Sequence, residues 1–295
     1  EENTTGSDNT AVGYQALTAN TTGSYNTAGG ISALATNTTG DFNTAFGRLA
    51  LLDNTSGDSN TALGTNALTN NTSADSNTAV GTNCMNQNTT GSQNTAIGDS
   101  SLRNATTAVG NVSVGYQALG SGTITTGHYN VCVGNNTAKN ITTGQYNTCV
   151  GHVAGTALTT GGYNAIFGYT STGGLTTGSN NTYIGFYAVP SAANVYGEMV
   201  LSSGNSSTLG KGGATAYIAS HDGAGNPGGV YRGGNSSSWS TTSDIRIKKN
   251  VVDNNTGLDK INEIRVRNFE YRTEEEITEL PSTCVIKKNG LQLGV

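Results

Sequence analysis

A seventeen-residue repeat runs through most of this 295-residue chain. Eleven copies of the phrase Asn-Thr-Ala-Val-Gly, or near variants of it, begin at Asn9 and follow one another at this interval, except for one longer step between Asn111 and Asn130. Asn at position 1 and Gly at position 5 occur in all eleven copies, the last of which ends at Gly185. Such self-similarity indicates that each copy is one unit of a stack.

The length of the repeat restricts what each unit can be. A unit this short, with Thr-Gly and Gly-Ser turns, cannot hold two packed helices, but it can hold two short strands and two turns. Side chains alternate between the two faces of a strand, and we expect the mostly apolar position 4, from Val12 to Ile184, to line an interior. Gly at position 5 permits a corner or a close backbone approach, and Asn in register forms an amide ladder.

The sequence therefore predicts an all-β fold, a parallel β-solenoid or β-roll of eleven coils over residues 1–189. At about 4.8 Å per coil, the rod is about 50 Å long. Position 3 is mostly Ala, and an apolar residue recurs at position 9 in the early copies, from Leu17 to Leu119. Because the Ala column is too small to close a wide core, we expect chains to pack through it, as a homotrimer.

Charge is scarce in the repeats, which excludes several functions. Residues 1–190 hold three basic and eight acidic residues, so no basic face exists and nucleic-acid binding is not expected. No run of 18 apolar residues is present, so membrane insertion is not expected. The four cysteines lack the spacing of zinc sites, so neither a metal nor a cofactor is expected; they are Cys84, Cys132, Cys149 and Cys284.

Two features of the repeats have alternative interpretations. Cys132 and Cys149 lie one period apart in one column; they either pair as a disulfide or, as we favour, replace Ala as small buried thiols. Asn-x-Thr/Ser sequons either carry glycans along one edge of the rod or, as we favour, serve turn chemistry. The sequons begin at Asn3, Asn20, Asn37, Asn54, Asn71 and Asn88.

The period is lost from about Pro190, and residues 190–242 are expected to form a small β neck or tip. The segments EMVLSS and ATAYIASH predict strands, whereas the Gly-rich segments between them predict turns. Four side chains of this region either contact a receptor or sugar or, as we favour, pack the β region. They are His221, Tyr231, Arg232 and Trp239.

The last segment carries a more specific pattern. It begins Ser-Asp-x-Arg-x-Lys, continues with a helix expected over residues 257–264 and a strand over 265–272, and ends in Gly-Val. This pattern resembles the start of the peptidase S74 domain, the intramolecular chaperone at the C-terminus of many phage tail fibres and tailspikes. The matching residues are Ser243, Asp244, Arg246, Lys248, Leu258, Ile261, Phe269, Tyr271, Gly294 and Val295.

The resemblance implies both a fold and a reaction. Residues 243–295 would be the N-terminal part of an α+β chaperone domain, whose family pattern continues with Ile-Ala-Gln-Glu and a helical part. Such domains trimerise, assist assembly of the β-structured shaft and then cut themselves off. By this resemblance Ser243 is the nucleophile and Lys248 the base, with cleavage between Ser243 and Asp244. A Ser hydroxyl needs a base, and Lys serves where burial lowers its pKa.

The repeats also resemble those of trimeric autotransporter adhesin heads, which have a shorter period, and those of phage and large-virus tail-fibre shafts. We therefore expect a viral tail fibre or receptor-binding appendage, located in the virion or otherwise extracellular. Its partners would be two further copies of itself, a host surface receptor such as a glycan, and other virion tail proteins. No turnover enzyme is expected beyond one self-cleavage. The alternatives are a bacterial surface adhesin or filament and, disfavoured because the eight acids are scattered singly, a glycan-degrading tailspike.

Overall fold

The computed structural model describes residues 3–122, 126–203, 208–221, 227–233 and 240–241, together with two short strands near the C-terminus. The chain divides into two compact units, Glu1–Ser243 and Asp244–Val295. In the second unit, β18 (Asn268–Phe269) and β19 (Gln292–Leu293) pair in antiparallel orientation. The helix expected over residues 257–264 lies outside the described residues.

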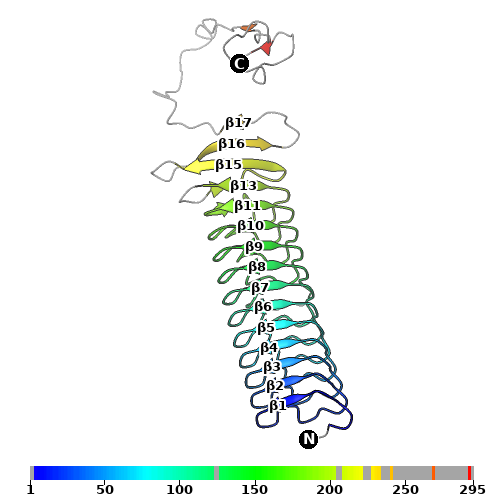
Figure 1. Ribbon diagram of the computed structural model, residues 1–295. Coiled ribbons are helices and arrows are strands. Elements are labelled where there is room, and N and C mark those ends of the chain that lie inside the picture. The colour runs from blue at the N-terminus through cyan, green and yellow to red at the C-terminus, as the bar shows by residue number, and fades with distance from the viewer. Residues whose placement is uncertain are drawn as a thin grey trace, which may run out of the picture. The chain divides into compact units, whose positions relative to one another are not determined.

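The first unit contains a parallel β-solenoid, which confirms the predicted fold class (Figure 1). Each coil of the repeat contributes one strand to a single sheet, and neighbouring strands pair in register, with Thr10 opposite Thr27 and Ala11 opposite Ala28. No helix occurs among the described residues. The repeat strands are β1 (Thr10–Val12), β2 (Thr27–Gly29), β3 (Thr44–Phe46), β4 (Thr61–Leu63), β5 (Thr78–Val80), β6 (Thr95–Ile97), β7 (Val112–Val114), β8 (Val131–Val133), β9 (Thr148–Val150), β10 (Ala165–Phe167) and β11 (Thr182–Gly185).

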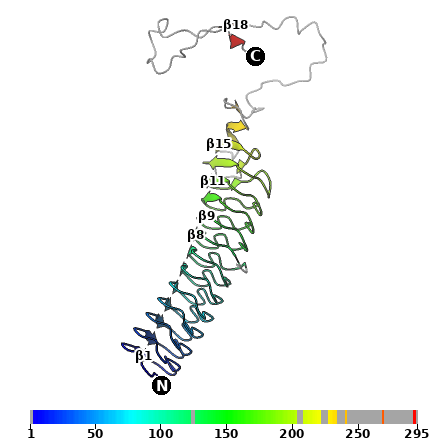
Figure 2. The ribbon, with the colours of Figure 1, turned by 90° about the vertical axis from the view of Figure 1, so that its right-hand side faces the viewer.

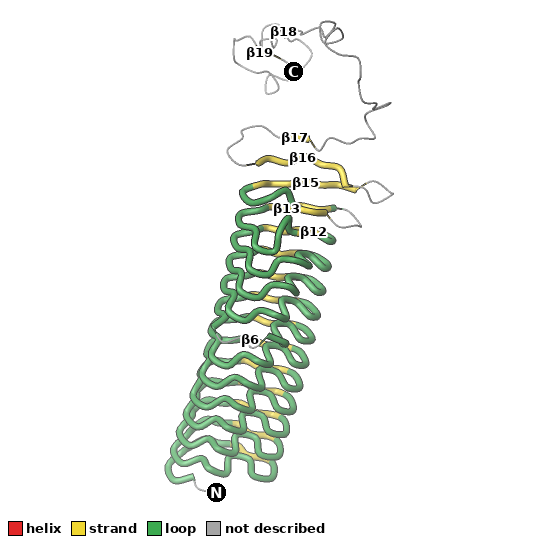
Figure 3. The backbone as a smooth tube through the Cα atoms, turned by 180° about the vertical axis from the view of Figure 1, so that it is seen from behind, coloured by secondary structure: helices red, strands yellow, loops and turns green. Residues whose placement is uncertain are grey.

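Each repeat coil has one strand instead of the expected two, and the rest of the coil is turn (Figure 3). Besides the Gly at position 5, three positions per coil, numbers 7, 9 and 17, have positive φ, as at Ser32 (55°), Leu34 (51°) and Phe42 (59°). For a non-Gly residue this left-handed conformation is less stable by about 1–2 kcal/mol, and it interrupts extended backbone. Hydrogen bonds between coils hold the turns nevertheless: the Leu34 N–H donates to the Ala50 carbonyl at 3.0 Å.

The interior is lined by positions 3, 8 and 9, so the prediction for position 4 is wrong. The Ala28 side chain at position 3 is fully buried, whereas the Phe46 side chain at position 4 is 50% exposed. Alternation along the strand requires that one of the two faces outward. The prediction that chains pack through the Ala column is also wrong, because the Leu side chains at position 9 of the same chain are buried with the Ala side chains in one core cluster.

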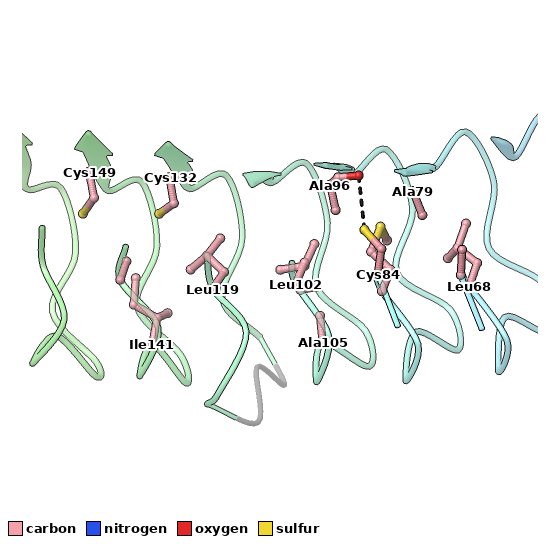
Figure 4. Close-up of a cluster of buried hydrophobic side chains, with 14 of the residues drawn as sticks. Leu68, Ala79, Cys84, Ala96, Leu102, Ala105, Leu119, Cys132, Ile141 and Cys149 are labelled. Carbon is pink, nitrogen blue, oxygen red and sulfur yellow. Dashed lines mark hydrogen bonds between the residues drawn. The ribbon is translucent and has the colours of Figure 1, made fainter. Parts of the chain in front are cut away.

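The large core side chain changes position about halfway along the solenoid (Figure 4). Early coils have Leu at position 9, as at Leu68, and later coils have Leu or Ile at position 12, as at Ile141 and Leu158, all buried. Position 9 of the Leu158 coil is Gly155, where a Cβ atom would lie 2.8 Å from the Cys149 Sγ. Close-packed interiors tolerate side-chain exchange when the total volume is kept. Here a large side chain at position 12 replaces the large side chain at position 9 of the same coil.

The expected Asn ladder exists at position 1, and a second Asn ladder runs along position 12. At position 1, the Asn43 N–H donates to the Asn26 Oδ1 at 2.9 Å, and the Asn43 Nδ2 donates to the Gly57 carbonyl at 2.8 Å. At position 12, the Asn54 Nδ2 donates to the Asn37 Oδ1 at 2.8 Å. The second ladder consists of the sequon residues Asn20 to Asn88, which are buried in the folded rod. The glycan interpretation is therefore wrong for these five residues, and their side chains cap the turns as favoured.

Gly at position 5 makes the close backbone approach that the sequence predicts. Gly81 has a φ of 136°, and a Cβ atom there would lie 2.5 Å from the Gly98 carbonyl oxygen of the next coil. Any side chain would separate the coils, which explains why all eleven copies keep Gly.

The repeat period continues beyond Pro190, although the phrase does not. Strands β13 (Met199–Ser202) and β15 (Thr215–His221) extend the same parallel sheet, with Met199 opposite Thr182 and Ala216 opposite Met199. These are the two strands predicted in the neck. The sheet then turns antiparallel through β16 (Pro227–Gly233) and β17 (Ser240–Thr241). A second, two-stranded sheet pairs β12 (Ala188–Val189) with β14 (Thr208–Leu209).

Candidate interaction surface

One apolar column runs along the outer face of the sheet, through position 4 of every coil; the side view shows the stacked coils that it crosses (Figure 2). We call it the outer column. Strand pairing places its members opposite one another from β1 to β16. They are Val12, Gly29, Phe46, Leu63, Val80, Ile97, Val114, Val133, Val150, Phe167, Ile184, Leu201, Ile218 and Val230.

The outer column is solvent-accessible over its whole length. The Ile97 side chain is 42% exposed, the Ile218 side chain is 43% exposed, and the remaining members are exposed or half-buried. Position 2 faces the same way and is Thr in eight of the eleven repeat strands. Thr and Val both favour strands, so strand propensity alone would allow Thr at position 4 as well, yet Thr never occurs there. The outer column is therefore apolar for another reason.

The outer column ends in a groove near the C-terminal end of the described solenoid. The groove has a volume of about 530 Å³, and Ile184, Leu201, Ile218 and Val230 line it from four neighbouring strands. The hydrogen-bonded strands give it a rigid wall. Its lining suits an apolar ligand group and contains no Asp, Glu, Lys, Arg or His.

Aromatic rings stack along the rod on either side of the strands. At position 17, Tyr129, Tyr146 and Tyr163 have ring centroids 5.2 and 4.9 Å apart. At position 6, Tyr169 and Phe186 stack with centroids 5.2 Å apart. Neighbouring rings stack nearly face to face, and the side chains nevertheless stay exposed, as at Tyr163 (60%). The stacks were not predicted, although the recurrence of aromatic residues at the repeat period reveals them.

A buried carboxylate lies where the Asn ladder of position 1 ends. Glu198 stands one period after Asn181, and its oxygens accept hydrogen bonds from the Tyr183 hydroxyl at 2.8 Å, the Ser191 N–H at 3.1 Å and the Gly212 N–H at 2.7 Å. Burial, followed by the adjacent Glu198 carboxylate, raises the pKa of Tyr183. With three donors, this carboxylate is satisfied in place and fits a structural role.

Three acidic residues of the shaft are not scattered, contrary to the expectation. Asp41, Asp58 and Asp75 occupy position 16 of successive coils, and each accepts a hydrogen bond from the backbone N–H of the preceding coil, as from the Asp41 N–H to the Asp58 Oδ1 at 2.7 Å. Their role is to cap the backbone along one edge. The edge carries repeated like charge.

The cysteines of the shaft are free thiols. Cys132 and Cys149 lie directly opposite one another in β8 and β9 and are fully buried and unpaired, as the favoured interpretation predicts. Burial raises the pKa of Cys132 well above its ordinary value, with a smaller contribution from Cys149. Cys84 is also buried and free, and Cys284 lies outside the described residues. Within the described residues, no group of His, Cys, Asp and Glu side chains is arranged to hold a metal ion.

The neck residues are only partly placed. The Tyr231 side chain packs against the buried core, as favoured, and the Arg232 side chain is exposed. The side chains of His221 and Trp239 lie outside the described residues. A contact that was not predicted from the sequence involves the Lys211 Nζ, which lies 4.8 Å from the centre of the Tyr217 ring.

The predicted dyad, Ser243 and Lys248, lies outside the described residues, so its geometry stays a prediction. The two compact units nevertheless meet in sequence at Ser243 and Asp244, the bond that the resemblance marks for cleavage. Among the described residues, none forms a helix long and hydrophobic enough to cross a bilayer. Comparisons of the chain with protein-family models, with curated proteins and with solved structures find no match.

Proposed function

We propose that this chain is a trimeric viral tail fibre or host-attachment appendage whose C-terminal segment is a self-cleaving assembly chaperone. The solenoid is the shaft, and its partners are two further copies, a host surface receptor and neighbouring tail proteins. The site of action is the virion surface. The shaft provides reach, and three chains in one fibre provide multivalent contact, which increases avidity without a tight single site.

The observation that carries the proposal is the position of the boundary between the compact units. It falls between Ser243 and Asp244, within the Ser-Asp-x-Arg-x-Lys motif that resembles a chaperone's cleavage site. A bond between two separately packed units can be cut without unfolding either one. The motif alone occurs often by chance. Its coincidence with the boundary between the two compact units therefore supports a removable C-terminal domain.

The solenoid gives a physical reason for a chaperone. Its coils repeat with nearly identical strands, so pairings displaced by one coil differ little in free energy. A trimer therefore needs its three chains aligned before the shaft forms. A globular trimer at the C-terminus of the shaft would set that alignment and could be removed afterwards.

Mass spectrometry of the protein expressed from its complete reading frame tests this proposal. We expect wild type to give a fragment that ends at Ser243, and Ser243→Ala to give the uncut chain. Lys248→Ala should also stay uncut, whereas its neighbour Lys249→Ala serves as the matched control and should be cut. Identical uncut masses for wild type and Ser243→Ala would show that self-cleavage does not occur.

A further inference from the structure

We propose that the outer column, with the Thr-rich position 2 beside it, is the surface through which parallel copies of this chain pack against one another. The inference rests on the proposed trimeric fibre for the direction of the copies. It replaces the buried Ala column as the contact between chains. The occupant is a second copy of this chain, with its coils level with those of the first.

The first step is the unexplained apolar character of the outer column. Soluble proteins rarely expose long continuous apolar patches, and where they do, the patch usually marks an interaction site. Thirteen of the fourteen members are large apolar residues, and the other is Gly29. The adjacent position 2 accepts Thr repeatedly, from Thr10 to Thr182, so the exclusion of polar groups applies to position 4 and not to the face as a whole.

The second step is the periodicity of the surface. The outer column presents one apolar group per strand, about every 4.8 Å along the rod. A complementary partner must present groups at the same interval, or contacts fall out of phase after a few coils. A parallel copy of this chain has that interval by construction. An ordinary globular receptor lacks it over such a length.

The third step is charge. Positions 2 and 4 contain no Asp, Glu, Lys, Arg or His from β1 to β15. Parallel copies place like columns near like columns, so an uncharged strip can meet itself without repulsion. The edge that carries Asp41, Asp58 and Asp75 would place like charges together in a packed trimer, and like charges at close range are destabilising. The charge distribution therefore favours the outer column over that edge.

The fourth step is area. The thirteen uncharged strands at the usual spacing extend about 60 Å, and two adjacent side-chain columns are about 13 Å wide, which gives about 800 Å² per chain. Stable protein interfaces bury about 800 Å² per partner. The strip thus has the area that one partner buries in a stable interface, and in a trimer it is shared between two neighbours.

Thiol accessibility in the 295-residue chain tests the inference. Cys284→Ser provides the background, because the shaft cysteines are buried. Ile97→Cys then reports on the outer column, and Ser73→Cys, an exposed turn position, is the matched control. Light scattering gives the number of chains, and a maleimide gives the labelling rate. We expect a trimer in which the thiol at position 97 reacts at least about tenfold more slowly than that at position 73, because interface cores exclude water.

The number of chains tests the proposed fibre, and the labelling rate tests the outer column. A trimer with equal labelling rates would leave the fibre standing and overturn the outer column as its interface, because the strip would then be open to the reagent. A monomer would overturn both. As a second measurement, Ile97→Asp combined with Val114→Asp should lower the oligomer mass while circular dichroism stays that of the folded rod, and Ser73→Asp should not. An unchanged mass for the double variant contradicts the inference.

Discussion

The Asn71 Nδ2 donates a hydrogen bond of 2.8 Å to the Oδ1 of Asn54, one coil earlier, and both side chains are buried. From Asn20 to Asn71, each amide of this ladder donates to the preceding coil and accepts from the following one. The ladder thus satisfies polar groups in the interior of the rod, where an unpaired amide is unfavourable by about 1–3 kcal/mol.

Removal of one ladder amide should be strongly destabilising. Asn71→Ala leaves the buried Asn54 Oδ1 without this donor and removes one of the two acceptors of the Asn88 Nδ2, which keeps the Gly91 carbonyl. We therefore expect the free energy of unfolding to fall by about 2 kcal/mol. Denaturant unfolding measures it. The matched control is the neighbouring Asn70→Ala, which removes only an exposed contact to Gln87 and should change stability by less than about 0.5 kcal/mol. Equal effects would contradict the role of the ladder.

Extension of the same ladder should be stabilising. Among the described residues, the Asn88 Oδ1 is buried and accepts no hydrogen bond, because position 12 of the next coil is Ala105. Ala105→Asn would place a donor there, and the coil of Leu68, Asn71 and Ala74 shows that this set packs. We expect the free energy of unfolding to rise by about 1 kcal/mol. A decrease in the thermal midpoint would show that the interior cannot accept the amide.

A methyl group at position 5 should separate two coils. Gly81→Ala would place a Cβ atom 2.5 Å from the Gly98 carbonyl oxygen at a φ of 136°, and we expect a loss of about 3 kcal/mol. The control is Gly173→Ala, where a Cβ atom would meet no described atom within 4 Å. Thermal unfolding distinguishes them, and a normal midpoint for Gly81→Ala would contradict the close approach.

Alkaline pH should destabilise the shaft through its buried thiols. Burial raises the pKa of Cys84 from 9.0 to about 12, with a smaller contribution from Asp99. Because the folded pKa lies above the unfolded one, the stabilisation is complete below about pH 9 and is lost as the pH rises toward 12. Cys84→Ala, which matches Ala67 in the preceding coil, should reduce this slope. Unfolding free energies from pH 7 to 11 measure it, and parallel curves would exclude Cys84 as the cause.

The period, the Gly column and the amide ladder could be predicted because each depends on repetition alone. Whether position 4 lies inside or outside could not be predicted. Alternation shows that Ala28 and Phe46 belong to opposite faces of the sheet, but it does not show which face is inside. Hydrophobicity favoured position 4, whereas the space left beside the Leu column at position 9 requires a small residue. The continuation past Pro190 was hidden because Glu198 replaces Asn at position 1 while keeping its backbone contact, its N–H donating to the Asn181 Oδ1 at 2.8 Å.

The candidate interaction surface was also hidden at the level of sequence. An exposed apolar column and a buried one have the same pattern in a strand, and only the position of Leu34 and its equivalents decides between them. The ring stacks of Tyr146 and Tyr163 depend on the in-register stacking, which the period does predict. The dyad of Ser243 and Lys248 rests on its motif and on the boundary between the compact units.

The one longer step of the repeat, from Asn111 to Asn130, has a consequence for how such solenoids change over generations. Val112 still pairs with Val131, and Ser113 with Cys132, so the sheet keeps its register across the longer step. Duplication or loss of one whole repeat would likewise leave every strand with an equivalent neighbour. Unequal recombination between similar repeats can therefore lengthen or shorten the solenoid in increments of about 4.8 Å, and its length becomes a trait that varies without redesign of the fold.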